Sequence, residues 1–168
     1  MRIFELLAGI GIGASLVAFS IALSANASDN TQDVQRIKAI EHKIVEATTT
    51  DQMMSYCDKD IVMYDFVPPL KYEGFEAVRA HEASIFFSKA KDIKAEFLDL
   101  DVVVDGNLGV ARSIQHFSWT EAGKPRQGTW RLTDIFKKTN GGWKAIHSHI
   151  SVPIDPKTGQ APLTYYQP

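Results

Sequence analysis

The sequence predicts an α+β domain in which a curved antiparallel sheet wraps around N-terminal helices. Apolar residues recur every three or four positions after Asp33, which is the spacing of an amphipathic helix. From Phe97 to Val152 they alternate with polar residues instead, and turn sequences rich in Gly and Asn separate the alternating stretches. Helices toward one end of a chain and strands toward the other are typical of the α+β class, and such a sheet leaves a pocket inside its cone.

The N-terminal half of the domain is expected to contain three helices and one strand. The threonines at 48–50 end the first helix, and Thr50 or Asp51 is expected to cap the second. Pro68 and Pro69 end the strand, because proline cannot donate a ladder hydrogen bond. The expected elements are a helix from Asp33, a short helix Gln52–Cys57, a turn at 58–60, a strand Ile61–Phe66 and a helix from about Glu76 to Lys89.

Four longer strands are expected to follow as a meander. A tight hairpin at 106–107 joins the first two, and a looser turn at 121–127 joins the second to the third. The Asn-Gly-Gly sequence at 140–142 turns the chain into the last strand. The expected strands are Phe97–Asp105, Leu108–Thr120, Gly128–Lys138 and Trp143–Val152.

The first 27 residues have the layout of a secretory signal peptide. Arg2 gives a weakly basic start, Leu6–Leu23 is apolar, and Ala-Asn-Ala at 25–27 is a small-x-small cleavage site. The alternative is a retained membrane anchor, because the apolar run approaches the ~20 residues of a spanning helix; its glycines and serines favour cleavage. We therefore expect cleavage after Ala27, a periplasmic or secreted location, a domain at 28–154 and a surface tail at 155–168.

The remaining chain has properties that narrow its partners. A net charge of −2 with dispersed charges argues against a nucleic acid or, after cleavage, a membrane as partner. Cys57 is the single cysteine, so no intramolecular disulfide can form, and its apolar surroundings favour a small hydrophobe over a nucleophile. A homodimer is expected through an exposed part of the sheet, such as Leu98–Leu100 or Ile114.

Asp134 is one candidate acid/base group. It shares a strand face with Trp130, Leu132 and Phe136, where lost hydration would raise its pKa and favour the neutral, proton-donating form. The alternatives are that this strand faces the other way, or that Asp134 forms a buried pair with Arg131 or a histidine.

Asp65 and the histidines complete the candidate set. Asp65 ends a strand, where it suits proton abstraction next to a carbonyl, or else caps backbone groups. His147 and His149 are two residues apart and therefore share a strand face. They are acid/base groups, satisfied core histidines, or a His-x-His metal site completed by Asp65 or Asp134, although no third ligand is evident. His81 is expected on the helix surface or the pocket rim.

Three segments carry a resemblance to the nuclear transport factor 2-like superfamily. They are CDKDIVMYDF at 57–66, GFEAVR at 74–79 and RLTDIFKKTNGGWKAIHSHIS at 131–151. Over residues 34–152 the chain resembles the SnoaL-like and ketosteroid-isomerase-like proteins, and its last segment is similar to the end of the association domain of calmodulin-dependent kinase II. The resemblance implies a cone-shaped, cystatin-like α+β barrel, a fold that hosts many functions.

The resemblance to ketosteroid isomerases also implies residue roles. Asp65 matches the place of the proton-shuttling acid, and Asp134 matches the protonated acid of the oxyanion hole. The oxyanion tyrosine of that family would fall near Glu41 or His42, and no tyrosine is present there, so steroid isomerisation is not expected. In this resemblance the strand face of His147 lines the cone.

Four further residues are expected to contact a ligand. Tyr64, Trp119 and Trp130 would suit a flat, apolar molecule with a polar handle, or they are ordinary core residues. Arg131 would bind a carboxylate of such a molecule, or it pairs with an acid at the surface.

The sequence therefore predicts an exported domain that binds a small hydrophobic molecule in the sheet cone. As an enzyme it would be an isomerase or dehydratase that needs no cofactor and no metal. Asp65 would be the base, Asp134 or His147 would donate to the oxyanion, and His149 would orient its neighbour. The alternative is a non-catalytic ligand-binding or dimerisation module of the same fold.

Overall fold

The structure, a computed structural model, describes residues 30–161 and confirms the α+β class. A helix over residues 30–45 is followed by the short α2 (Thr50–Met54), and α3 (Phe75–Glu82) continues into a π-helical turn, η1 (Ala83–Phe87). The expected signal peptide and its cleavage site lie outside this range. Within it, no helix has the length and apolar character needed to cross a membrane.

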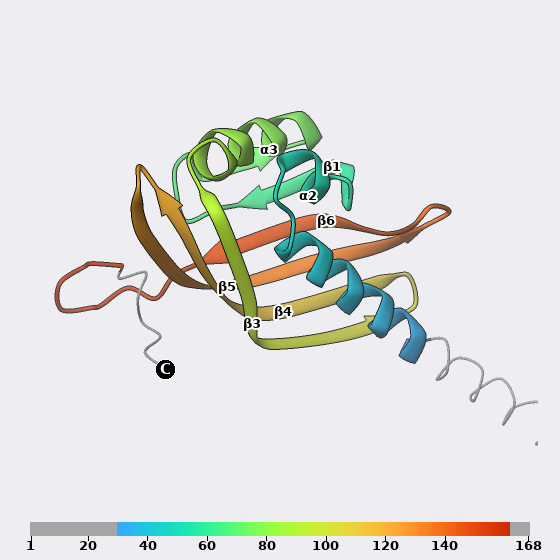
Figure 1. Cartoon of the computed structure of the whole chain (residues 1–168). Helices are drawn as coiled ribbons and strands as arrows, with labels where there is room; N and C mark the ends of the chain where they lie inside the picture. Colours follow the sequence, from blue (N-terminus) through green and yellow to red (C-terminus); the bar gives the residue numbers. More distant parts are fainter. Residues whose placement is uncertain (1–29, 162–168) are drawn as a thin grey trace, which may run out of the picture.

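Six strands form one curved sheet with the order β2-β1-β6-β5-β4-β3. The strands are β1 (Cys57–Tyr64), β2 (Tyr72–Glu73), β3 (Lys91–Asp105), β4 (Leu108–Glu121), β5 (Lys124–Thr139) and β6 (Gly142–Ser151). β3 to β6 form the expected antiparallel meander, but β1 runs parallel to β6, so the sheet is mixed. Figure 1 shows the helix of residues 30–45 crossing one face of the sheet, with α2 and α3 near β1.

Two local expectations are wrong, and one strand was not expected. β1 already begins at Cys57, which pairs with Ala145, so the predicted turn at 58–60 is part of the strand. β2 has only two residues, too few to give a periodic signal. α2 is capped by Thr49, whose hydroxyl accepts a hydrogen bond from the Gln52 amide at 3.3 Å.

Asp33 fixes the first turn of the N-terminal helix to the β5–β6 hairpin. Its carboxylate accepts hydrogen bonds from Trp143 Nε1 at 3.0 Å, Lys138 Nζ at 2.6 Å and Arg36 at 2.8 Å. Burial alone would raise the pKa of Asp33, but these hydrogen bonds outweigh it and lower the pKa below its ordinary value. The ionised carboxylate therefore ties residues that are 105 and 110 positions apart in the sequence.

The same helix approaches β4 so closely that only glycine fits at position 109. A Cβ atom at Gly109 would lie 2.3 Å from Cδ1 of Ile37 and within 3.6 Å of Val104 and Trp143. Ile37 is itself fully buried, so its side chain cannot move aside without disturbing the core.

We expect Gly109→Ala to lower the free energy of unfolding by about 1–3 kcal/mol, because the added methyl group overpacks the helix–sheet contact. Urea denaturation measures the change. Gly141→Ala is the matched control, since a Cβ there would meet only the Thr139 hydroxyl at 3.8 Å. Equal destabilisation by the two substitutions would contradict the close contact at Gly109.

Candidate active site

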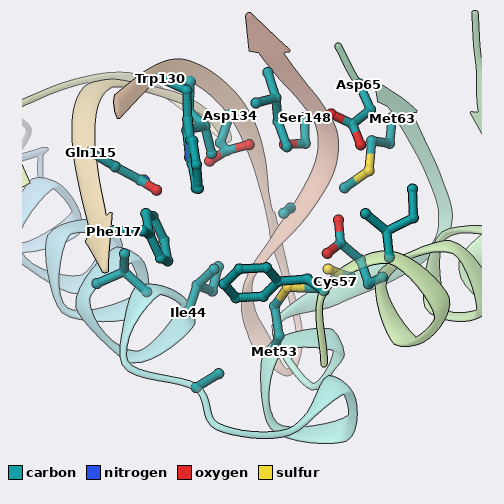
Figure 2. Close-up of a pocket in the computed structure, with 18 of the residues that line it drawn as sticks. Ile44, Met53, Cys57, Met63, Asp65, Gln115, Phe117, Trp130, Asp134 and Ser148 are labelled. Carbon is teal, nitrogen blue, oxygen red and sulfur yellow. The ribbon is translucent and has the colours of Figure 1, made fainter. Parts of the chain in front are cut away.

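A cavity of about 150 Å³ lies between the concave face of the sheet and the helices (Figure 2). Its wall comes from the end of the N-terminal helix, α2, η1, β1, β4, β5 and β6. The wall is mostly apolar, and its acidic side chains are Asp65, Glu82 and Asp134. Among the residues of 30–161 that line it there is no Lys, Arg or His.

Asp134 enters the cavity wall from β5, on the same face as Trp130 and Leu132, as the sequence predicts. It is 5% exposed and forms a hydrogen bond with Ser148 of β6. Burial raises the pKa of Asp134 to about 6, although the hydrogen bonds with Ser148 and Glu41 act in the opposite direction. Figure 2 shows its carboxyl group close to Ser148, with Asp65 on the other side of that serine.

Glu41, on the N-terminal helix, is the partner of Asp134 that the sequence analysis missed. It is fully buried, and within residues 30–161 its carboxyl oxygens meet no donor. Two carboxylates only accept, so the Glu41–Asp134 hydrogen bond requires that one of them keep a proton. Burial first, and then the charge and hydrogen bond of Asp134, raise the pKa of Glu41 to about 10. The Glu41–Asp134 pair therefore holds one proton at neutral pH.

Glu41 bonds to Asp134 but does not itself line the cavity. The sequence does carry a signal for its burial: Glu41 is one helical turn from both Ile37 and Val45, so an acid interrupts the apolar stripe.

Asp65 is held by His81 of α3. His81 Nε2 lies 2.6 Å from Asp65 Oδ2, and the backbone N–H of Phe66 donates to Oδ1 at 2.6 Å. Tyr72 stacks on the imidazole with ring centroids 3.8 Å apart, and both side chains of the Asp65–His81 pair are below 10% exposed (7% and 4%). His81 is therefore buried, not a surface or rim residue as expected, and it orients the carboxylate that faces the cavity.

Glu82 is the third acidic residue of the cavity wall. The sequence analysis did not identify it. Burial raises the pKa of Glu82 to about 7, and the nearby charge of Asp65 adds to the shift. No other side chain in the described part of the chain bonds to it. The π-helical turn starts at the next residue and brings Ile85, Phe86 and Phe87 into the wall. π-helical turns are frequent at functional sites.

Aromatic rings form another part of the wall. Trp130 stacks on Phe117 with centroids 4.5 Å apart, and Phe86 meets Phe117 edge-on at 5.9 Å. Trp119 stands behind this group, 5.7 Å from Phe86, and does not line the cavity. Trp130 is therefore placed to contact a ligand in the cavity, as expected, whereas Trp119 is not.

His147 and His149 lie on the outer face of the sheet, so the expectation that their face lines the cone is wrong. The β6 residues near them in the cavity wall are Ser148 and Ile150. Both histidines instead meet Tyr64, with ring centroids 4.9 and 5.8 Å away. Tyr64 is 40% exposed and likewise points away from the cavity.

A one-residue bulge in β6 is the physical reason for this reversal. Ile135 pairs with His147, but the next residue, Phe136, pairs with Ala145, so Ile146 has no partner on β5. An extra residue reverses which side chains point inward along the rest of the strand. Ala145 faces the core before the bulge, and the histidines that follow it face outward.

The roles predicted for Arg131 and for the dimer contacts depend on which of these residues are exposed. Arg131 is exposed and pairs with Ile114 across β4 and β5, so it cannot bind a carboxylate inside the cavity. Ile114 is 38% exposed, whereas Leu100 packs against the core and cannot serve as a surface contact. The homodimer stays a prediction.

The structure also bears on the reactivity of Cys57 and on the possible metal site. Burial, with added repulsion from Asp134 and Glu82, raises the pKa of the Cys57 thiol to about 12, which agrees with a thiol that is not a nucleophile. No three His, Cys, Asp or Glu side chains converge as metal ligands within residues 30–161.

Comparisons with known proteins agree on the family and the fold. The family described as SnoaL-like domain matches residues 37–155. An NTF2-like protein of unknown function from Pseudomonas putida has a similar structure (TM-score 0.72, 22% identity, covering 82% of this chain and 98% of that one).

Two further solved structures are similar to this chain. One is an NTF2-like superfamily protein from Salmonella enterica (TM-score 0.67, 17% identity, 79% and 99% covered). The other is a ketosteroid isomerase-like protein from Erwinia carotovora (TM-score 0.61, 16% identity, covering 71% of this chain and 95% of that one). At these identities they show the fold alone. No curated protein matches the chain.

Glu41→Gln tests the proton held by the Glu41–Asp134 pair. The folded state binds more protons than the unfolded chain wherever a carboxyl pKa is raised, so stability falls as pH rises from about 4.5 toward 10. One such group contributes a slope of up to about 1.4 kcal/mol per pH unit. We expect Glu41→Gln to flatten this slope, because its amide donates to Asp134 at every pH.

Urea unfolding at pH 5, 7 and 9 measures the slope. Glu46→Gln, at an exposed position just past the same helix, is the control and should keep the wild-type slope. A wild-type protein equally stable at all three pH values would contradict a shared buried proton.

Proposed function

The chain belongs to the family of SnoaL-like domains, and we propose that it binds a small, mostly apolar molecule in the cavity and catalyses an acid/base reaction without a cofactor. The observation that carries the proposal is the pairing of two different carboxyl systems in one apolar wall. Asp65 accepts hydrogen bonds and suits a base, whereas the Glu41–Asp134 pair retains a proton.

The reaction that fits these groups is proton abstraction next to a carbonyl. Asp65 takes the proton, and the electron pair of the C–H bond moves into the carbonyl to form an enolate. Asp134, in the protonated form that its raised pKa of about 6 favours, donates a hydrogen bond to the enolate oxygen. In an isomerisation Asp65 returns the proton to a different carbon. In a dehydration a neighbouring hydroxyl group leaves as water after taking a proton from Glu82.

The volume of the cavity limits which substrates are considered. An apolar cavity of about 150 Å³ holds a molecule such as benzene, and the cavity here has about this volume. One ring fits this volume, which supports a single-ring carbonyl compound as substrate.

The test is deuterium exchange next to the carbonyl of single-ring ketones (cyclohexanone, cyclohexenone and acetophenone) in D₂O, followed by NMR. We expect the wild-type protein to accelerate exchange and Asp65→Asn to reduce the rate at least about 100-fold, the usual contribution of a positioned base. Asp60→Asn, in β1 shortly before Asp65 and with a side chain 76% exposed, should keep the full rate. Ketones that bind without any protein-dependent exchange would favour the non-catalytic ligand-binding module.

His81 should act through Asp65 as a positioning residue. His81→Gln keeps a side-chain donor for the carboxylate, and we expect exchange within a few-fold of wild type. His81→Leu removes the donor, lets the carboxylate rotate, and should lower the rate constant about 100-fold with little change in ketone affinity. Equal losses in the two variants would show that imidazole chemistry, not orientation, is required.

A further inference from the structure

We propose that the cavity selects a single-ring molecule that carries an ammonium group and excludes carboxylates. This inference rests on the proposed function and names the ligand class of that same cavity. Its basis is a wall of carboxyl groups and aromatic faces that, within residues 30–161, contains no Lys, Arg or His side chain.

The carboxyl groups of the wall are incompletely satisfied. Glu82 faces the cavity with no hydrogen-bond or ion-pair partner among residues 30–161. Buried carboxylates without partners are unfavourable, and a ligand that donates hydrogen bonds and carries positive charge removes that penalty.

The positively charged side chains in the described part of the chain do not fill this role. His81 is bound to Asp65 on the side away from the cavity wall. Lys144 is the positive group nearest Cys57, but its ammonium donates to the Ser55 carbonyl. The remaining titratable groups that act on Glu82 or feel its charge are Asp65, Cys57 and Tyr72, none of which is a cation.

The aromatic part of the wall points to the same class of ligand. Trp130 and Phe117, which stack, and Phe86, which meets Phe117 edge-on, line the same cavity as the carboxyl groups. Aromatic faces attract organic cations and at the same time pack against an apolar ring. A carboxylate ligand would meet only negative charge.

Binding of an ammonium ion should therefore be linked to proton release. Burial raises the pKa of Glu82 to about 7 and that of Asp134 to about 6, so both groups are protonated at pH 5 and ionised at pH 8. A cation favours the ionised forms. Its affinity should rise with pH, by roughly 100-fold between pH 5 and pH 8 from Glu82 alone.

The experiment compares benzylamine, benzyl alcohol and benzoate by isothermal titration calorimetry at pH 5, 6, 7 and 8, in two buffers of different ionisation enthalpy. We expect benzylamine to bind best at pH 8 with release of protons. Benzyl alcohol should bind with little pH dependence, and benzoate should bind least.

Glu82→Gln should reduce benzylamine affinity at pH 8 at least about tenfold and remove most of its pH dependence, while benzyl alcohol affinity changes less than about twofold. The matched control is Glu76→Gln, which removes the same charge from the first turn of α3 at an exposed position and should change neither affinity.

The outcomes separate this inference from the proposed function. If benzyl alcohol binds as tightly as benzylamine at every pH, or if benzoate binds best, the charge selection is wrong while small-molecule binding stands. If none of the three molecules binds, both proposals fail. Loss of benzyl alcohol binding in Glu82→Gln would also overturn the inference, since it would show a general change of the cavity.

Discussion

The packing of the N-terminal helix against the concave face of the sheet is the contact on which the rest of the structure depends. Four residues spaced one helical turn apart make it: Asp33, Ile37, Glu41 and Val45, all 5% exposed or less. The first anchors the helix to the β5–β6 hairpin, the second fills the space above Gly109, the third shares a proton with Asp134, and the fourth lines the cavity. One stripe thus serves anchoring, packing and chemistry.

Two acids on that helix face show how hydrogen-bond partners determine the protonation state of a buried carboxyl group. Asp33 and Glu41 are equally withdrawn from solvent, yet the pKa of Asp33 is lowered and that of Glu41 is raised. Asp33 accepts from three donors, two of them cationic, whereas Glu41 faces another acid. The stability that Asp33 contributes allows the helix to hold Glu41 where it is unfavourable, and such arrangements are common at functional sites.

Much of this arrangement could be predicted from the sequence, and the failures have physical causes. Alternation along residues 128–138 correctly places Asp134 inward, because no bulge interrupts β5 before it. The same reasoning fails for His147, since the extra residue at Ile146 arises from pairing with β5 and leaves no local signature. Glu41 and His81 both lie in apolar helical stripes, which is the sequence signal for their burial, although His81 was expected at the surface or the pocket rim. Which carboxyl group each one meets depends on strands far away in the chain.

The two proposals meet at the same carboxyl groups. Removing a proton next to a carbonyl creates negative charge in an apolar wall that already contains three acids, and the proton shared by Glu41 and Asp134 can offset only part of it. An ammonium group on the substrate would add a positive charge within the cavity at that moment. The substrate would then bring part of the compensation itself, since no Lys, Arg or His of residues 30–161 lines the cavity. A neutral ketone and its ammonium-bearing analogue should therefore differ more in exchange rate than in affinity, since the charge they offset is larger in the transition state than in the ground state.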